Sequence, residues 1–212
     1  MSLKTNNNPL IDVYNILESV IRTNVQDVNE TRRVLPTARE RQWIYPQTPE
    51  EELQYYPICA IILNDISYNE FSANQFYGYQ TNPVSGEVTV LKMNYAILNL
   101  TVGIFTKKKD KFMVTLPNDT TERLISGTLL NAYLTGKIIK AIQDKRDSFI
   151  LEGIEDLVIT RTDMNYVDNE ILFASNINLT VVIPNIWGKV YTTGELIDEI
   201  NKTYTISYTL GE

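Results

Sequence analysis

The chain has no histidine and a single cysteine, Cys59, among its 212 residues. Without histidine, Ser–His–Asp and Cys–His catalysis and imidazole zinc sites are excluded. One cysteine forms neither an internal disulfide nor a thiolate metal site. Cys59 lies in an apolar run, PICAIILN at 57–64, and we expect it to be buried in the core.

Long apolar segments are also missing. No run reaches the ~20 residues that cross a bilayer, and the N-terminal MSLKTNNNPLIDVY has no apolar stretch of signal-peptide length. We therefore expect a soluble protein without a membrane partner.

Recognisable catalytic spacings are absent as well. The acidic groups at 50–52 and 152–156 show no paired-carboxylate pattern. TGKI at 135–138 lacks the first glycine and the hydroxyl residue of a phosphate-binding loop. We expect a protein that is not an enzyme, with no catalytic, cofactor-binding or metal-binding residues.

Positive charge is in the minority, since 19 Lys and Arg face 26 Asp and Glu, a net charge of −7. General nucleic-acid-coating proteins are usually basic, so this balance disfavours such a role. A local patch still acts within about one Debye length, roughly 8–10 Å.

Periodicity predicts an α+β fold, with a mostly antiparallel sheet and two helices packed on one face. Pro9 begins an amphipathic helix over 9–24. The predicted strands are 57–64, 95–106, 156–164 and 171–184, the last two forming an antiparallel hairpin that Pro184 ends. The segment KKKDKFMVTLPND at 107–119 is expected to be a connection to the next element. A long helix then begins at the capping-box-like pair Asp119 and Glu122, runs to about Arg146, and packs closely at Gly127 and Gly136.

Two additions accompany a single domain over 1–184. Residues 65–93, with the turn NPVSG, predict a hairpin-like projection. Its aromatic side chains either contact another subunit or fold back on their own domain: Tyr68, Phe71, Phe76, Tyr77 and Tyr79. The extension over 185–212 ends in TYTISYTL, where Tyr204, Ile206 and Tyr208 alternate with Thr and Ser. Such a strand suits addition to a sheet edge, its own or a neighbour's.

Two basic segments have alternative interpretations. The first is a loop in which arginines are interleaved with aromatics: Arg32, Arg33, Arg39 and Arg41, with Trp43 and Tyr45. These side chains either stack on nucleic-acid bases, or the aromatics hold a surface loop on the body. Lysines follow the 95–106 strand, where they are either solvated or bind phosphates or an acidic partner: Lys107, Lys108, Lys109 and Lys111.

The order of elements resembles the tail terminator (neck) proteins of long-tailed bacteriophages. LIDVYNILESVI is the first helix, YYPICAIILN the first strand and YAILNLTVGIFTK the central strand. ERLISGTLLNAYLTGKIIKAI is the packed helix, and DLVITRTDM with ILFASNINLTVVI is the closing pair. The resemblance covers about 9–64 and 94–184 and rests on pattern, without a diagnostic motif.

The resemblance implies a structural virion protein of the tail neck, assembled in the host cytoplasm. Copies would form a hexameric ring that caps the tail tube and joins it to the head-side connector. DNA would pass through without being read, and the lysines would meet a partner surface. Another head–tail joining or tail-completion protein, and a nucleic-acid-binding module, remain alternatives.

Overall fold

The computed structural model describes residues 9–48, 55–68, 75–82, 84–115, 122–151, 153–166 and 172–191. The chain divides into two compact units. The first, called the body below, comprises Met1–Ile66 and Ile97–Ile183; the second comprises Ser67–Ala96 and Pro184–Glu212. The fold is α+β, as predicted. None of the described helices is long and apolar enough to span a bilayer.

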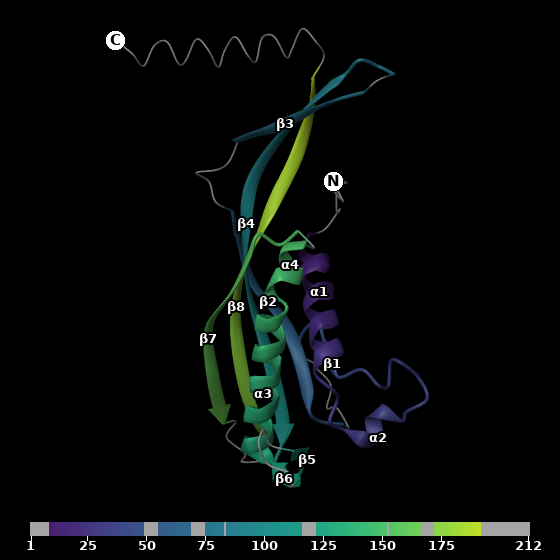
Figure 1. Ribbon diagram of the computed structural model, residues 1–212, viewed down its shortest axis with the longest axis vertical. Helices are drawn as coiled ribbons and strands as arrows, with labels where there is room; N and C mark the ends of the chain where they lie inside the picture. Colours follow the sequence, from purple (N-terminus) through teal and green to yellow (C-terminus); the bar gives the residue numbers. More distant parts are fainter. Residues whose placement is uncertain are drawn as a thin grey trace, which may run out of the picture. The chain divides into compact units, whose positions relative to one another are not determined.

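Two helices of the body lie side by side over its sheet (Figure 1). α1 (Pro9–Asn24) has the predicted bounds, and Val13, Leu17 and Ile21 form its buried stripe at helical spacing. In α3 (Gly127–Asp144), Leu130, Leu134 and Ile138 are buried in the same way. Two shorter helices, α2 (Glu30–Arg33) and α4 (Arg146–Leu151), accompany them.

The main sheet has the strand order β1-β2-β4-β8-β7. Its strands are β1 (Ile44–Tyr45), β2 (Ile58–Tyr68), β4 (Val88–Lys107), β8 (Leu172–Tyr191) and β7 (Asp156–Tyr166). β1 is parallel to β2, with Ile44 opposite Cys59. β7 and β8 form the predicted antiparallel pair, with Leu157 opposite Val181.

The central strand β4 confirms the predicted period of two. Ala96, Leu98, Leu100, Val102 and Ile104 are all buried. Asn99 and Thr101, between them, are partly exposed. One face of the sheet therefore packs into the core while the other remains polar.

The strands β2, β4 and β8 are longer than predicted. β2 continues to Tyr68, and β4 starts at Val88. β8 runs through Pro184 to Tyr191, so the prediction that Pro184 ends the strand is wrong. Proline only removes a donor and is tolerated in a strand where its nitrogen needs no partner.

The segment between β4 and α3 corrects two predictions. Lys111–Thr115 is a strand, β5, and not a connection. Glu122–Ser126 is its antiparallel partner, β6, so no helix begins at Glu122, while Asp119 lies outside the described residues. Val114 and Ile125 are buried. Their burial and the ladder hydrogen bonds outweigh the local capping signal, which predicted a helix start from sequence spacing alone.

The helix α3 begins directly after this hairpin, at Gly127. Gly127 has φ +55°, and a Cβ there would lie 3.1 Å from a ring carbon of Phe173. The predicted close packing is therefore confirmed at Gly127. It is wrong at Gly136, where a Cβ would meet no atom within 4 Å.

A buried polar connection joins α3 to the sheet. The Asn131 side chain donates to the backbone oxygens of Ile104 (2.9 Å) and Phe173 (3.2 Å). One turn later the hydroxyls of Thr135 and Ser175 are in hydrogen-bond contact, at 2.5 Å. These bonds fix the register of the helix against β4 and β8, which apolar contacts alone specify less sharply.

Cys59 is fully buried in β2, as expected, and burial raises the pKa of its thiol to about 12. The thiolate is the reactive form, so the folded protein keeps this cysteine inert at pH 8. We expect alkylation by iodoacetamide to follow global unfolding, with rapid labelling in denaturant and little in buffer. Mass spectrometry of the labelled chain checks this, and fast labelling of native protein would contradict it.

The described part of the second unit contains an antiparallel strand pair. β3 (Gln75–Thr81) pairs with the first part of β4, with Thr81 opposite Val88. The connecting turn is closed by hydrogen bonds between the backbones of Asn82 and Glu87 and of Gly86 and Asn82. Gly86 has φ +72°, which favours glycine.

Candidate partner-binding surface

The lysines after β4 lie on a turn with a defined structure. The Asp110 carboxylate accepts a hydrogen bond from the Lys107 amide at 2.6 Å, and the Asp110 amide donates to the Lys107 carbonyl at 3.0 Å. Partial burial raises the pKa of Asp110, opposed by the Lys107 amide and nearby cationic side chains. Lys108 and Lys109 are exposed on this turn. The sequence prediction of a solvated strand end therefore omitted the carboxylate that shapes it.

An aromatic ring supports the first lysine of the turn. The Lys107 ammonium lies 4.2 Å from the ring centroid of Tyr56, a cation–π contact. The backbone around Tyr56 is held by two side chains of the α2 region. Asn29 donates to the Tyr56 carbonyl, and Arg32 donates to the carbonyls of Tyr55 and Pro57. The lysine turn is therefore anchored to a braced segment.

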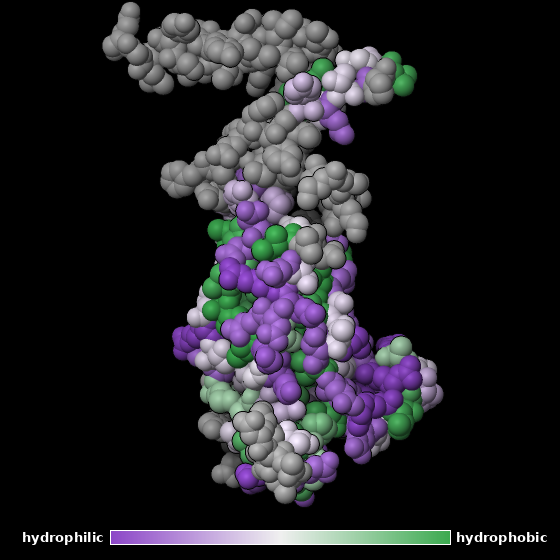
Figure 2. All heavy atoms as spheres, in the orientation of Figure 1, coloured by the Kyte–Doolittle hydropathy of each residue, from purple (hydrophilic) through white to green (hydrophobic). Residues whose placement is uncertain are grey.

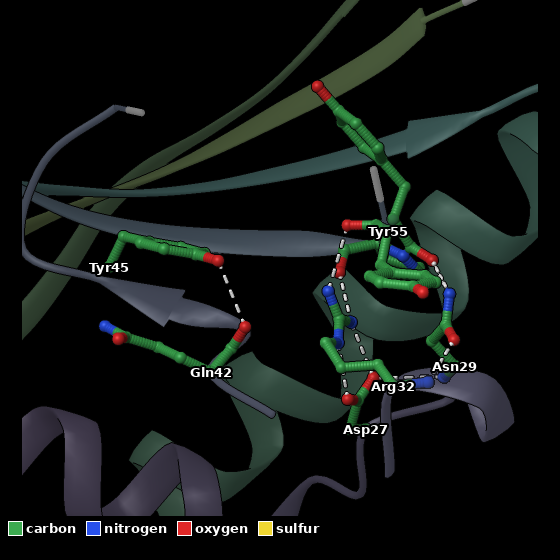
Figure 3. Close-up of polar contacts among 8 residues, drawn as sticks. Asp27, Asn29, Arg32, Gln42, Tyr45 and Tyr55 are labelled. Carbon is green, nitrogen blue, oxygen red and sulfur yellow. Dashed lines mark hydrogen bonds and ion pairs between the residues drawn. The ribbon is translucent and has the colours of Figure 1, made fainter. Parts of the chain in front are cut away.

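Arg32 is the centre of this brace (Figure 3). Its side chain is almost fully buried, and its guanidinium donates to both carboxylate oxygens of Asp27, at 2.6 and 2.7 Å. A bidentate, buried pair of this kind depends on each partner being neutralised by the other. Asp27 and the three-residue segment 55–57 together satisfy the guanidinium.

The arginine–aromatic loop is thus pinned to the body by at least two of its members. Trp43 is buried at 4% exposure, and Arg32 at 1%. Tyr45 donates its hydroxyl hydrogen to the Gln42 carbonyl within the same segment. Neither Arg32 nor Trp43 can stack on a base, whereas Arg39 and Arg41 are exposed.

The hairpin β5–β6 presents a mixed apolar and basic face beside the turn. Val114 and Ile125 are buried in the core. The ring centroids of Phe112 and of Tyr133, on α3, are 6.1 Å apart. Strand alternation puts Lys111, the directly opposed pair Met113 and Leu124, and Glu122 on the outer side. Met113 is 46% exposed and Leu124 is 58% exposed. The sequence prediction noted the lysines and missed this apolar pair.

The face of the body's sheet that points away from the core carries a ladder of polar side chains, most of them neutral. Asn64 donates to Thr101, and Thr101 donates to Asn178, both at 2.8 Å. In a second row, Asn99 donates to Asp65 at 2.8 Å and accepts from Thr180 at 2.9 Å. These bonds link the strands β2, β4 and β8 across this face.

The predicted contact residues of the projection and the C-terminal extension are only partly described. Tyr68 at the end of β2 is 55% exposed, and Tyr79 in β3 is 71% exposed. The backbones of Phe76 and Tyr77 lie in β3. Phe71, Tyr204, Ile206 and Tyr208 lie outside the described residues. A subunit contact through these residues stays a prediction.

Within the described ranges, no three acidic or cysteine side chains gather closely enough to hold a metal ion. The face shown in Figure 2 carries mostly hydrophilic side chains over α3.

The lysine turn and the outer side of β5–β6 together combine positive charge on a structured turn with exposed apolar area. That composition suits recognition of a protein.

No protein-family model matches the chain, and no curated protein matches it. Among solved structures, it is similar to the sheath/tube terminator of an extracellular contractile injection system, PVC, in the extended state, with a TM-score of 0.45 and 11% sequence identity. That match covers 87% of this chain and 59% of the other, so the chain spans less than two thirds of that protein's length.

Proposed function

We propose that this protein is a structural tail terminator that forms a ring on the end of a tail tube. The observation that carries the proposal is the order of elements. The first helix, the central strand, the packed helix and the closing strand pair follow one another as in the terminators that the sequence resembles. In this proposal six copies close the ring, which joins the tube to a head-side connector. The protein acts in the virion neck after assembly in the host cytoplasm.

The proposed activity is mechanical and needs no catalytic residue. A ring on the last tube layer blocks further addition of tube subunits by occupying their binding surface. DNA passes through the opening without base-specific contacts, and the polar ladder around Asn99, Thr101 and Asn178, which carries no basic side chain in these bonds, is a suitable surface for such passage. The protein is not an enzyme in this proposal.

Tail length tests the proposal directly. Disruption of the gene is expected to give particles or free tails with overlong tubes, because polymerisation is no longer stopped, and complementation should restore a uniform length. Electron microscopy of negatively stained lysates measures the length distribution. Tails of normal, uniform length without heads would instead indicate another head–tail joining or tail-completion protein.

A further inference from the structure

We infer that the outer side of the lysine turn and the β5–β6 hairpin binds the acidic C-terminal segment of a second copy of this chain. We call this surface the basic hairpin face, formed by Lys108, Lys109, Lys111, Met113 and Leu124. The inference deepens the proposed function, on which it rests in part, because it names the contact that joins neighbouring subunits.

The shape of the face is fixed before a partner arrives. Asp110 closes the turn, and the Tyr56 ring holds Lys107. Phe112 contacts Tyr133 of α3, and Val114 is buried, so the hairpin is attached to the body along its inner side. A preformed face loses less conformational entropy on binding than a mobile lysine tail would.

The composition of the face favours a protein over a nucleic acid. Met113 and Leu124 are directly opposed and are about half exposed, with Lys111 on the same side of the hairpin. A nucleic-acid backbone binds through its phosphates to positive charge, and an exposed apolar pair adds nothing to that interaction. A protein segment that places apolar side chains between carboxylates would use both parts of the face.

One segment of this chain has that composition. Residues 194–200, GELIDEI, alternate Glu195, Asp198 and Glu199 with Leu196, Ile197 and Ile200. The whole stretch 192–212 contains four acidic residues and one lysine. It lies outside the described residues, and its charge is opposite to that of the basic hairpin face.

The chain leaves the body far from the basic hairpin face. Asn131 donates to the carbonyls of both Ile104 and Phe173, so Phe173 lies at the lysine end of the body. Ile183, the last residue of the body, is ten strand residues further along β8, about 33 Å away. A seat on the same copy would require the chain after Ile183 to run back over that distance, so we assign the segment to a neighbouring copy.

A contact of this kind is heterologous, because it joins two different surfaces of each copy. Repeated around an axis, such a contact closes a ring when the rotation allows it. The contact therefore accounts for ring formation by an acidic chain that carries an organised basic patch.

A charge-swap series on the full chain tests the inference. We expect Lys108→Glu, Lys109→Glu and Lys111→Glu together to weaken self-association at least about 100-fold, because like charges would face each other. Glu195→Lys, Asp198→Lys and Glu199→Lys together should have the same effect. The variant that combines the two sets should self-associate at least about 10-fold more tightly than a variant with either set alone. Sedimentation velocity over a wide concentration range measures each association constant.

Two further variants sharpen the series. Lys140→Glu, Lys145→Glu and Arg161→Glu change the net charge by the same amount elsewhere and should leave association unchanged. Met113→Ser with Leu124→Ser should weaken association at least about 10-fold without charge reversal. Circular dichroism confirms that each variant is folded.

Several results would overturn the inference. They are a wild-type chain that stays monomeric, lysine variants that associate normally, or a combined variant that is not rescued. Salt-sensitive binding of duplex DNA that depends on Lys108, Lys109 and Lys111 would assign the face to nucleic acid instead. Normal rings that still stop tail growth in the lysine variants would refute this contact and retain the proposed function. If the combined variant is rescued but tails keep their normal length after gene disruption, the contact between copies is retained and the proposed function is refuted.

Discussion

Replacing Arg32 with alanine is expected to lower the free energy of unfolding by about 3–5 kcal/mol. The side chains of Arg32 and Asp27 are 2% and 9% exposed, so the substitution leaves a carboxylate without its counter-charge in a site that water reaches poorly. It also leaves the carbonyls of Tyr55 and Pro57 without the guanidinium donor. Urea denaturation followed by tryptophan fluorescence and circular dichroism measures the change.

An exposed ion pair in the same helix provides the matched control. Glu30 pairs with Arg33 at 3.5 Å and is 84% exposed on its side chain. Glu30→Ala is therefore expected to cost under about 1 kcal/mol. The double variant Asp27→Leu with Arg32→Met should recover part of the loss, because no lone charge remains buried. A loss below about 1 kcal/mol for Arg32→Ala would show that the pair is not the brace described here.

Replacing Asn131 with alanine is expected to cost roughly 2–4 kcal/mol, the second large effect. The substitution removes two buried hydrogen bonds, from the Asn131 amide to the carbonyls of Ile104 and Phe173, and each costs about 1–2 kcal/mol in a buried site. Asn131 is 2% exposed, so water cannot readily replace it. Chemical denaturation reports the loss, and hydrogen exchange should rise at the start of α3.

A second asparagine serves as the comparison. Asn178 accepts from Thr101 and donates to Asp163, yet it lies on the partly exposed polar face of the sheet. Asn178→Ala is expected to cost under about 1 kcal/mol, because solvent can satisfy its partners there. Equal losses at Asn131 and Asn178 would mean that burial does not set the cost of these bonds.

Local periodicity was sufficient for much of the fold. The helix α1 begins at Pro9, as its helix-start signal predicts, and its buried stripe follows the apolar spacing from Val13 to Ile21. The alternation in β4 correctly separated the buried Leu98 and Leu100 from the partly exposed Asn99 and Thr101. These features depend on side chains within a few residues of one another, so a sequence pattern records them.

The features that the sequence did not predict depend on residues far apart in the chain. Glu122–Ser126 forms a strand because it pairs with Lys111–Thr115, although its own residues suggested a helix start. Arg32 reads as a surface arginine, and its burial depends on Asp27 and on carbonyls more than twenty residues later. The bond between Thr101 and Asn178 joins strands far apart in the chain. No local spacing encodes these partners.

The sequence by itself determined that histidine-based catalysis is absent, that the fold is α+β, and which faces of α1 and β4 are buried. Only the tertiary structure decided that the lysines after β4 form an ordered turn, and that Met113 and Leu124 stand beside them on an exposed hairpin face. The physical reason is that composition and period fix which side chains avoid water. Which of them meet depends on strand pairing and packing across the whole body.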